Sequence, residues 1–475
     1  MFEKPLGVIH MEKVDALSLA NGINEAVTLY NLSWNNCVAQ CYDGASVMSG
    51  PFSGVQARIK QAAPHVTYVH CHSHRLNLIL VNIIKFVPEI SDLFGKVQAI
   101  YVFLSNSSPR HELFIKAQKE DGLSVLELER LVETRWYYWY RSVRKIKLRI
   151  TTIAVVLESI ANQSADSIAA LEAKGLLRHL SSTSFLHCLL VVEALLGKIN
   201  ALSEELQSNN INYLAANSLI EQTQADLESM RCQNFWQKIV DEANVIKVKM
   251  QQVTSFEFAD YSHSKRRQEM SRKLSDYFVL STVGKKTVDG CEAEAEVEKV
   301  TILFQCIDKC LHEMKARFAG NKSLLYNVSL FKPESPTFLS SLCATELLKL
   351  YPTCDIDPIV VEAQMQSANS YISSQVPQVV DIHELRTKLS ILPRAFSEVI
   401  KLIDLVLTLP VTSVENERFF SCMKRVKTYL RNSCGDKRLS DLLVLASLQE
   451  ETKNVDIDIV IDEFARMKCR RYPLL

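Results

Sequence analysis

Asn36–Tyr42 reads NCVAQCY and Val66–His70 reads VTYVH, and these two short stretches decide the fold class of the chain. Both are rich in β-branched or aromatic residues and both are bounded by turn-forming residues, so both are predicted to be strands. Between them, Ser53–Gln61 has the spacing of a helix, and Pro64 ends it. A strand, a helix and a second strand in this order predict a parallel pair joined by a crossover, the signature of an α/β fold.

A helix is predicted directly after the second strand. Its apolar positions recur at three- and four-residue spacing and stop before Pro88. They are Leu76, Ile79, Leu80, Ile83, Ile84 and Val87.

Helix-breaking residues are missing from the middle third of the chain. No proline stands between residues 110 and 332, and residues 123–283 contain only two glycines. This third is therefore predicted to consist of long helices, among them Leu189–Leu206 and Leu219–Met250. Ser281–Val300 is polar and alternates Glu with small residues, which predicts a solvated loop within the helical region.

Two further helices are predicted near the C-terminus. Pro410 precedes the first, and Thr412-Ser413-Val414-Glu415 has the spacing of a capping box, in which side chains satisfy amide groups at a helix start. The apolar stripe of the first helix is Phe419, Met423, Val426 and Leu430, and that of the second is Leu439, Leu442, Leu443 and Ala446. The sequence thus predicts α/β structure together with all-α structure.

The overall charge of the chain is balanced, with 54 Lys and Arg against 54 Asp and Glu in 475 residues. This excludes a basic footprint over the whole protein, so nucleic acid would have to meet a local patch. A hydrophobic fraction of 47% excludes global disorder. The 13 cysteines are scattered along the chain, which favours free thiols in a reducing compartment.

No segment is predicted to cross a membrane or to direct secretion. Met1–Lys13 lacks the cationic start and apolar run of a signal peptide. The most apolar run, Phe185–Gly197, contains His187 and Glu193 and is shorter than the roughly 18 residues that a span needs. The sequence therefore predicts a soluble protein without a membrane partner.

Asp43, Cys71 and His74 are the candidate site residues beside the predicted strands. Asp43 follows the first strand, at the strand end where open α/β sheets hold ligands and metal ions, although the local sequence favours a turn or a helix cap. Cys71 and His74 stand three residues apart and so share a helix face. Two ligands fill only half of a tetrahedral zinc site, so packing or hydrogen bonding is the favoured role for this pair.

The run ETRWYYWY at residues 133–140 is followed by a series of cations. These cations are Arg141, Arg144, Lys145, Lys147 and Arg149. Aromatic rings interleaved with cations suit nucleic acid, because bases stack on the rings while the cations meet phosphates. The alternative is an aromatic helix core with a solvated basic face, and the residues alone favour neither.

The chain contains, in this order, the strings CYDGASVMSG, GVQARI, YVHCHSHRLNLIL, HELF, the ETRW run and LPVTSVENERFFSCMKRVKTYLRNSCGDKRLSDLLVLASL. Taken together, they resemble the transposase domain of the hAT superfamily, including its zinc finger MYM-type protein 1-like members. The similarity covers most of the chain and is strongest from Cys41 to Trp136 and from Leu409 to Leu448.

The resemblance implies an RNase H-like core that is interrupted by a large helical insertion and ends in C-terminal helices. Residues 1–140 and 401–475 would belong to the core, and residues 141–400 would form the insertion. The C-terminal part is also a dimerisation region in this family. The implied chemistry is that of DDE enzymes, in which three carboxylates hold two divalent metal ions that activate water and stabilise the leaving oxygen.

The resemblance also implies roles for individual residues. Asp43 matches the second catalytic aspartate and Glu417 the catalytic glutamate, so these two would be the metal ligands. Periodicity alone places Glu417 on an exposed helix face. Cys71 and His74 match the structural Cys-x-x-His motif of the family, and Trp136 matches the tryptophan that stabilises flipped DNA bases. The DNA contacts implied or suggested by the basic run are Trp136, Arg135, Arg141, Arg144 and Lys145.

The first catalytic aspartate of the family has no counterpart in this sequence. Only 42 residues precede Asp43, and they match the third strand of the core (Phe2–His10) and its first helix (Lys13–Tyr30). The first two strands of the core and their aspartate are therefore expected to be missing. No cofactor is expected, and Mg²⁺ would bind only if the full catalytic core were present.

The expected function is that of a domesticated, catalytically inactive hAT transposase-derived protein in the nucleus, with the cytoplasm as the alternative location. It would act through a homodimer or through dimers with related hAT-derived proteins, with DNA or chromatin as a further partner. The alternative is an active DDE transposase or endonuclease represented by an N-terminally truncated gene model. A purely structural interaction module is the third hypothesis.

Overall fold

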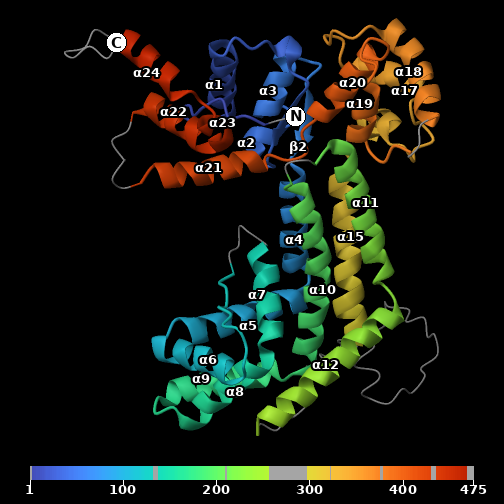
Figure 1. The fold of residues 1–475 in the computed structure, drawn as a ribbon. Coiled ribbons are helices and arrows are strands. Elements are labelled where there is room, and N and C mark those ends of the chain that lie inside the picture. The colour runs from blue at the N-terminus through green and yellow to red at the C-terminus, as the bar shows by residue number, and fades with distance from the viewer. Residues whose placement is uncertain are drawn as a thin grey trace, which may run out of the picture. The chain divides into compact units, whose positions relative to one another are not determined.

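The computed structural model describes residues 3–131, 137–208, 211–255, 297–320, 322–374, 378–428 and 435–467 (Figure 1). These residues are mostly helical and include one two-stranded sheet. The chain divides into two compact units, of which unit one comprises residues 1–75, 206–217 and 320–475 and unit two comprises residues 76–205 and 218–319. Unit one therefore combines segments from both ends of the chain.

Unit one contains the parallel strand pair that the sequence predicts. β1 (Ala39–Tyr42) pairs in parallel with β2 (Thr67–His70). The crossover between them contains the short helix α2 (Ser46–Ser49) and the longer helix α3 (Val55–Ala62). The α/β pattern is thereby confirmed for this part of the chain.

The first strand begins later than predicted because a tight turn precedes it. Trp34–Asn36 forms a single 3-10 turn, η1, in which the Ser33 hydroxyl accepts a hydrogen bond from the amide of Asn35. A serine side chain that binds a nearby amide in this way competes with strand formation. The predicted strand residue Asn36 therefore belongs to the turn.

Helix α1 (Ala16–Leu29) confirms the helix expected over Lys13–Tyr30. Asp15 caps it, since its carboxylate accepts hydrogen bonds from the amides of Leu17 and Ser18. The apolar face of α1 packs on a buried cluster under the crossover. This cluster is Val55, Ile59, Ala63 and Val66, with Ala16, Leu19 and Ile23 against it.

The strand expected over Phe2–His10 is wrong. Residues 3–10 contain no strand, and Phe2 lies outside the described residues. The amide of Val8 donates a hydrogen bond to the Ser440 hydroxyl at 3.0 Å, and the Tyr30 hydroxyl donates one to the carbonyl of Leu6. Side chains thus satisfy backbone groups that a neighbouring strand would otherwise satisfy.

The other regular elements that the structure describes in unit one are all helices. It contains α16 (Lys322–Val328), η3 (Ser329–Phe331), α17 (Ser341–Leu350), α18 (Pro358–Ser373), α19 (Ile382–Leu389), α20 (Ser397–Thr408), α21 (Val414–Val426), α22 (Asp436–Ser447), α23 (Gln449–Lys453) and α24 (Ile457–Arg466). Ser340, Asp357 and Asp381 cap α17, α18 and α19 by accepting hydrogen bonds from first-turn amides.

The two predicted C-terminal helices are confirmed as α21 and α22, and their apolar stripes face each other. Their buried cluster is Cys422, Leu439 and Leu443, with Val8, Phe419, Met423, Val426 and Ala446 packed against it. The predicted capping box is wrong, because the capping position is Ser413 and its side chain makes no capping hydrogen bond. Glu415 pairs with Arg418 instead. Leu430 lies outside the described residues.

Unit two contains helices and no strand in its described residues. Its elements are α4 (His72–Phe86, in this unit from Leu76 onward), α5 (Pro88–Ser105), α6 (Ser108–Glu120), α7 (Tyr137–Leu148), α8 (Ile150–Gln163), α9 (Ser167–Leu180), α10 (Thr183–Leu206, in this unit up to Glu205), α11 (Tyr213–Ser229, in this unit from Ser218 onward), α12 (Gln233–Val253), η2 (Lys299–Phe304) and α15 (Gln305–Phe318). The long helices expected from the missing prolines and glycines are confirmed.

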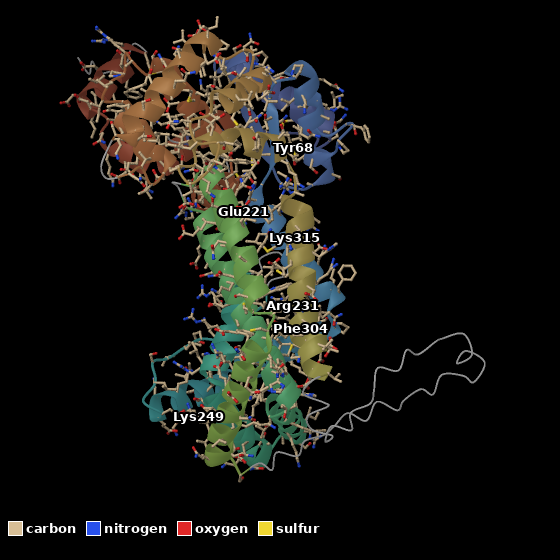
Figure 2. All side chains as sticks on the ribbon, turned by 90° about the vertical axis from the view of Figure 1, so that its right-hand side faces the viewer. Tyr68, Glu221, Arg231, Lys249, Phe304 and Lys315 are labelled. Atoms are coloured by element: carbon tan, nitrogen blue, oxygen red, sulfur yellow. The ribbon has the colours of Figure 1, made fainter. Side chains whose placement is uncertain are left out.

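The helix expected over Leu219–Met250 is interrupted by a turn at residues 230–232, which separates α11 from α12. Arg231 at this turn donates to both carboxylate oxygens of Asp308 on α15, at 2.7 and 3.0 Å. Its guanidinium also lies 4.4 Å from the ring centroid of Phe304 (Figure 2). These contacts hold the turn against η2 and α15, which apolar periodicity does not reveal.

The loop expected over Ser281–Val300 is wrong for its last four residues, which are helical. The rest of that stretch lies outside the described residues. Lys299, in the π-helix η2, is buried and donates to the side-chain oxygen of Gln233 at 2.8 Å. Its apolar stem is thus covered while its ammonium group keeps a polar partner.

Helix α10 is the one described helix that is long and apolar enough to cross a membrane by length and composition. Of its most apolar 18-residue window, 72% is buried within the protein. Burial of this extent is typical of the central helix of a helical unit.

Candidate functional site

The candidate site in unit one lies where the two parallel strands end. Asp43 follows β1 directly, and Cys71 follows β2 and donates its amide hydrogen to the carbonyl of Tyr42 at 2.9 Å. Asp43 is exposed, and its Oδ1 accepts a hydrogen bond from the amide of Ala45 at 3.2 Å. This is the turn-forming role that the local sequence favours for Asp43.

Gly44 leaves room for two histidine rings at this turn. The rings of His70 and His74 stack with their centroids 5.7 Å apart. A Cβ atom on Gly44 would stand 2.9 Å from the His70 ring and 3.1 Å from the His74 ring. The glycine of the Asp-Gly-Ala string is therefore required by close approach, because its backbone φ is not in the left-handed region.

The sulfur of Cys71 accepts a hydrogen bond from the amide of Ser413 at 3.3 Å. The neighbouring Cys41 thiol lowers the pKa of the buried Cys71 thiol to about 6, against the opposing effect of burial. The Cys71 thiol and burial together raise the pKa of Cys41.

The sequence offers Cys71 and His74 as metal ligands or as a brace, and neither belongs to a described group of three side chains that could hold a metal ion. The ring of His74 stacks on the ring of His70. The next residue of this motif, His72, is buried, and its ring meets Tyr213 edge-on with centroids 5.8 Å apart. Burial, followed by the charge of Arg75, lowers the pKa of His72 to about 4.

Backbone contacts connect the end of β2 to the segment that leads into α21. The amide of His72 donates to the carbonyl of Val411 at 3.0 Å, next to the bond from Ser413 to Cys71. Three residues at most separate each contact partner from the start of α21 at Val414. The strand ends and the N-terminus of α21 are therefore held together in unit one.

Glu417 lies on α21 with its side chain exposed, as periodicity predicts. The neighbouring Glu415 is occupied by Arg418, which also donates to the carbonyl of Gln207 at 2.8 Å. Among the described residues, no three His, Cys, Asp or Glu side chains are arranged to hold a metal ion. Asp43 and Glu417 are consequently not part of a three-carboxylate set, and the described residues do not fit the metal pair of DDE enzymes.

The basic face of α7, in unit two, is largely occupied by carboxylates. Glu129 pairs with Arg141 at 2.5 Å and with Lys145 at 2.7 Å. Arg144 is exposed and bonds only the hydroxyl of Tyr140, at 3.2 Å, among the hydrogen bonds and ion pairs that the structure describes for it. Of Arg141, Arg144 and Lys145, Arg144 is thus the most accessible to a phosphate.

The aromatic run divides between core and surface. Trp139 is buried and packs on Phe94 with ring centroids 5.2 Å apart, whereas Tyr137 is exposed. Arg135 and Trp136 lie outside the described residues. Trp139 therefore belongs to the helix core, as one of the two interpretations of the aromatic run predicts.

An open pocket of about 1040 Å³ adjoins α7 in unit two. Phe94 and Trp139 contribute aromatic rings to its lining, and Lys85 and Arg130 contribute cations. Neither Lys85 nor Arg130 belongs to the aromatic-basic run, so the sequence pattern does not single them out. Gln98, also in the lining, accepts a hydrogen bond from the amide of Leu131 at 3.0 Å and so fixes the chain beside Arg130.

Comparisons with known proteins confirm the resemblance to hAT-derived proteins at both ends of the chain. Residues 1–54 match the family described as "ZMYM1/FAM200, RNase-like domain", and residues 394–450 match the "hAT family C-terminal dimerisation region". Two curated relatives, the 52 kDa repressor of the inhibitor of the protein kinase from mouse and from human, are each 21% identical to the chain. The alignments cover 97% and 98% of this chain, respectively, and 60% of the length of each relative.

Proposed function

We propose that this hAT transposase-derived protein works through self-association of its C-terminal helices and contacts DNA or chromatin without cutting DNA. Its two strands and their crossover would be part of an RNase H-like core. The observation that carries the proposal is the dimerisation match at residues 394–450, which contains α20, α21 and α22. The word "repressor" in the names of the relatives supports a role in the nucleus.

Exposed apolar side chains on the matched helices support the self-association. The inner faces of α21 and α22 pack on each other, yet Phe420 is 55% exposed and Leu445 is 51% exposed. Large apolar side chains that stay uncovered in one chain gain free energy when a second chain covers them. The outer faces of α21 and α22 are therefore the proposed contact surface.

The pocket beside α7 supports a contact with DNA. Two of its lining residues, Lys85 and Arg130, offer charge for a phosphate. Arg144 adds an exposed cation on the neighbouring helix. Because the net charge of the chain is zero, these local cations would carry any attraction to DNA.

The roles of Asp43 and Glu417 support the absence of strand cleavage. Asp43 forms a turn, and neither Asp43 nor Glu417 belongs to a described group of three side chains that could hold a metal ion. The test is an end-labelled duplex incubated with the protein and Mn²⁺. Intact duplex is expected, and nicking that disappears in Asp43→Asn would contradict the proposal.

Light scattering coupled to size exclusion tests the self-association. The protein is expected to elute with the mass of a dimer, and Phe420→Glu and Leu445→Glu are each expected to shift it toward the monomer. Leu342→Glu is the matched control, because Leu342 is 69% exposed on α17, outside the matched region. A monomeric wild-type protein, or an equal effect of the control, would contradict the proposal.

A further inference from the structure

We propose that α24 of one chain packs on the outer face of α21 in a second copy of this chain. The inference rests on the proposed function and deepens it, because it names the element that covers the exposed ring of Phe420. Helix α24 begins at Ile457, beyond the end of the dimerisation match at residue 450. The match itself therefore assigns no role to this helix.

Helix α24 has an apolar face that the rest of the chain leaves exposed. Its apolar side chains recur at three- and four-residue spacing and so share one face of the helix. They are Ile457, Val460, Ile461 and Phe464. None of the residues of α24, all of which the structure describes, is buried, and Ile457 is 71% exposed. Covering this face with another apolar surface would therefore release free energy.

The polar side of α24 is acidic. Residues 456–466 contain a single cation, Arg466, which pairs with Glu463 at 2.9 Å. Their four carboxylates are Asp456, Asp458, Asp462 and Glu463. Asp458 and Asp462 stand one turn apart on the same side of the helix, next to the apolar face. The surface that covers α24 should accordingly combine an apolar centre with positive charge.

The outer face of α21 has this combination. Phe420 stands one turn before Lys424 and two turns before Lys427, so these three side chains share a face. All three are exposed, because the buried stripe of α21 faces α22. Residues 420–427 contain three cations, with Arg425 as the third, and no carboxylate. The face therefore complements α24 both in charge and in its exposed ring.

Two observations favour a second copy of the chain as the source of α24. In Figure 1, α22 lies between α24 and α21, so α24 does not cover the Phe420 face of its own chain. Phe420 also lies within the dimerisation match, so a contact there continues the interface that the match indicates. In a two-fold dimer each α24 meets the α21 of the other chain, and the contact forms twice.

The experiment reverses the charge of each surface in the full chain. Asp458→Lys with Asp462→Lys makes α24 basic, and Lys424→Glu with Lys427→Glu makes the α21 face acidic. Each double variant alone should raise the dissociation constant of the dimer about tenfold in analytical ultracentrifugation at low salt, because like charges then meet in both contacts. An equimolar mixture of the two double variants should restore the wild-type value, since in the heterodimer every α24 meets an α21 of opposite charge.

The mixture distinguishes between the possible occupants of the α21 face. Rescue on mixing requires that α24 and α21 come from different chains. Docking of α24 on its own chain or on an unrelated protein would give no rescue, and that result would overturn the inference.

An apolar variant tests the same contact without any change of charge. Ile461→Ser should raise the dissociation constant about tenfold, because it removes an apolar side chain from both contacts. Ile459→Ser is the matched control on the same helix, since Ile459 lies on the polar side and is 62% exposed. Equal effects of the two substitutions would overturn the inference. A monomeric wild-type protein would overturn the proposed function as well, whereas a dimer that all these variants leave intact would overturn this inference alone.

Discussion

The strand-end site and the basic face of α7 are both candidate sites in the sequence, yet their residues have different kinds of partner in the structure. At the strand ends, groups from separate segments bond to one another, as the amide of Ser413 and the sulfur of Cys71 do. On α7, the cations find carboxylates instead, and Glu129 alone takes two of them. Parallel strands bring their ends together, whereas a charge run on one helix is distributed around that helix and acquires local partners.

The largest expected effect is on stability, and it tests whether the aromatic run serves the core or a binding surface. Trp139→Ala should lower the free energy of unfolding by about 3–5 kcal/mol, because it removes a buried ring that packs on Phe94. Tyr137→Ala is the control on the same helix and should change it by less than about 1 kcal/mol, since Tyr137 is exposed. Chemical denaturation measures both, and similar losses for the two variants would contradict the assignment.

A pH effect should arise at the strand-end site. The pKa of His72 is lowered to about 4 by burial and by Arg75, whereas an unfolded histidine titrates near 6.5. As the pH falls, the unfolded chain therefore binds the proton first. The contribution of His72 to the free energy of unfolding is complete above about pH 6.5 and is lost as the pH falls toward 4. The loss is about 3 kcal/mol.

Denaturation curves between pH 7 and pH 4 measure this effect, and His72→Gln should flatten the dependence. Cys71 contributes in the same direction at the upper end of this window, because its lowered pKa of about 6 adds stability that is lost between about pH 9 and 6. The comparison with His72→Gln separates the two groups, since the variant keeps Cys71. An unchanged slope in His72→Gln would show that another group titrates in this window.

A glycine substitution should distinguish the crowded turn from an open helix. Gly44→Ala should destabilise unit one by about 1–3 kcal/mol, because the new Cβ would stand 2.9 Å from the His70 ring. Gly95→Ala in α5 should instead stabilise the protein by about 0.5–1 kcal/mol, since nothing lies within 4 Å of its added Cβ. Thermal unfolding should show opposite signs, and a neutral Gly44→Ala would mean that the histidine rings can move aside.

The smallest effect concerns the cations of α7. Arg144→Ala should reduce the slope of log K against log salt for DNA binding by about 0.9, the value for one phosphate contact. Arg141→Ala should change the slope less, because Arg141 is already paired with Glu129. Filter binding at several salt concentrations measures the slopes, and a larger change for Arg141→Ala would place the DNA contact on the paired cations.

The sequence predicted the parts of the fold that depend on local patterns. Turn-bounded strands, the crossover helix, the proline-free helices and the paired C-terminal stripes all follow from residues close together in the chain. It failed where a distant contact decides, as with residues 3–10, whose backbone bonds Ser440 and Tyr30, and with the turn at Arg231, which Asp308 holds.

The candidate site shows the same division. Asp43 and Cys71 could be selected from their places after the strands, and the turn role of Asp43 follows from its local sequence. The bond between Cys71 and Ser413 could not be predicted, because Ser413 lies outside the motif of Cys71 and comes from the opposite end of the chain. Likewise, Lys85 and Arg130 become candidates only through the pocket that they line.

Hydrogen exchange at two protein concentrations tests the central claim of self-association most directly. When the protein concentration is raised from below to above the association midpoint, amide protection should rise in α21 and α22. It should stay unchanged in α17, which lies outside the matched region. Covering an exposed helix face slows the opening of its hydrogen bonds, so the change should map the contact surface. Protection that does not depend on concentration in α21 and α22, or that rises only elsewhere, would contradict the account.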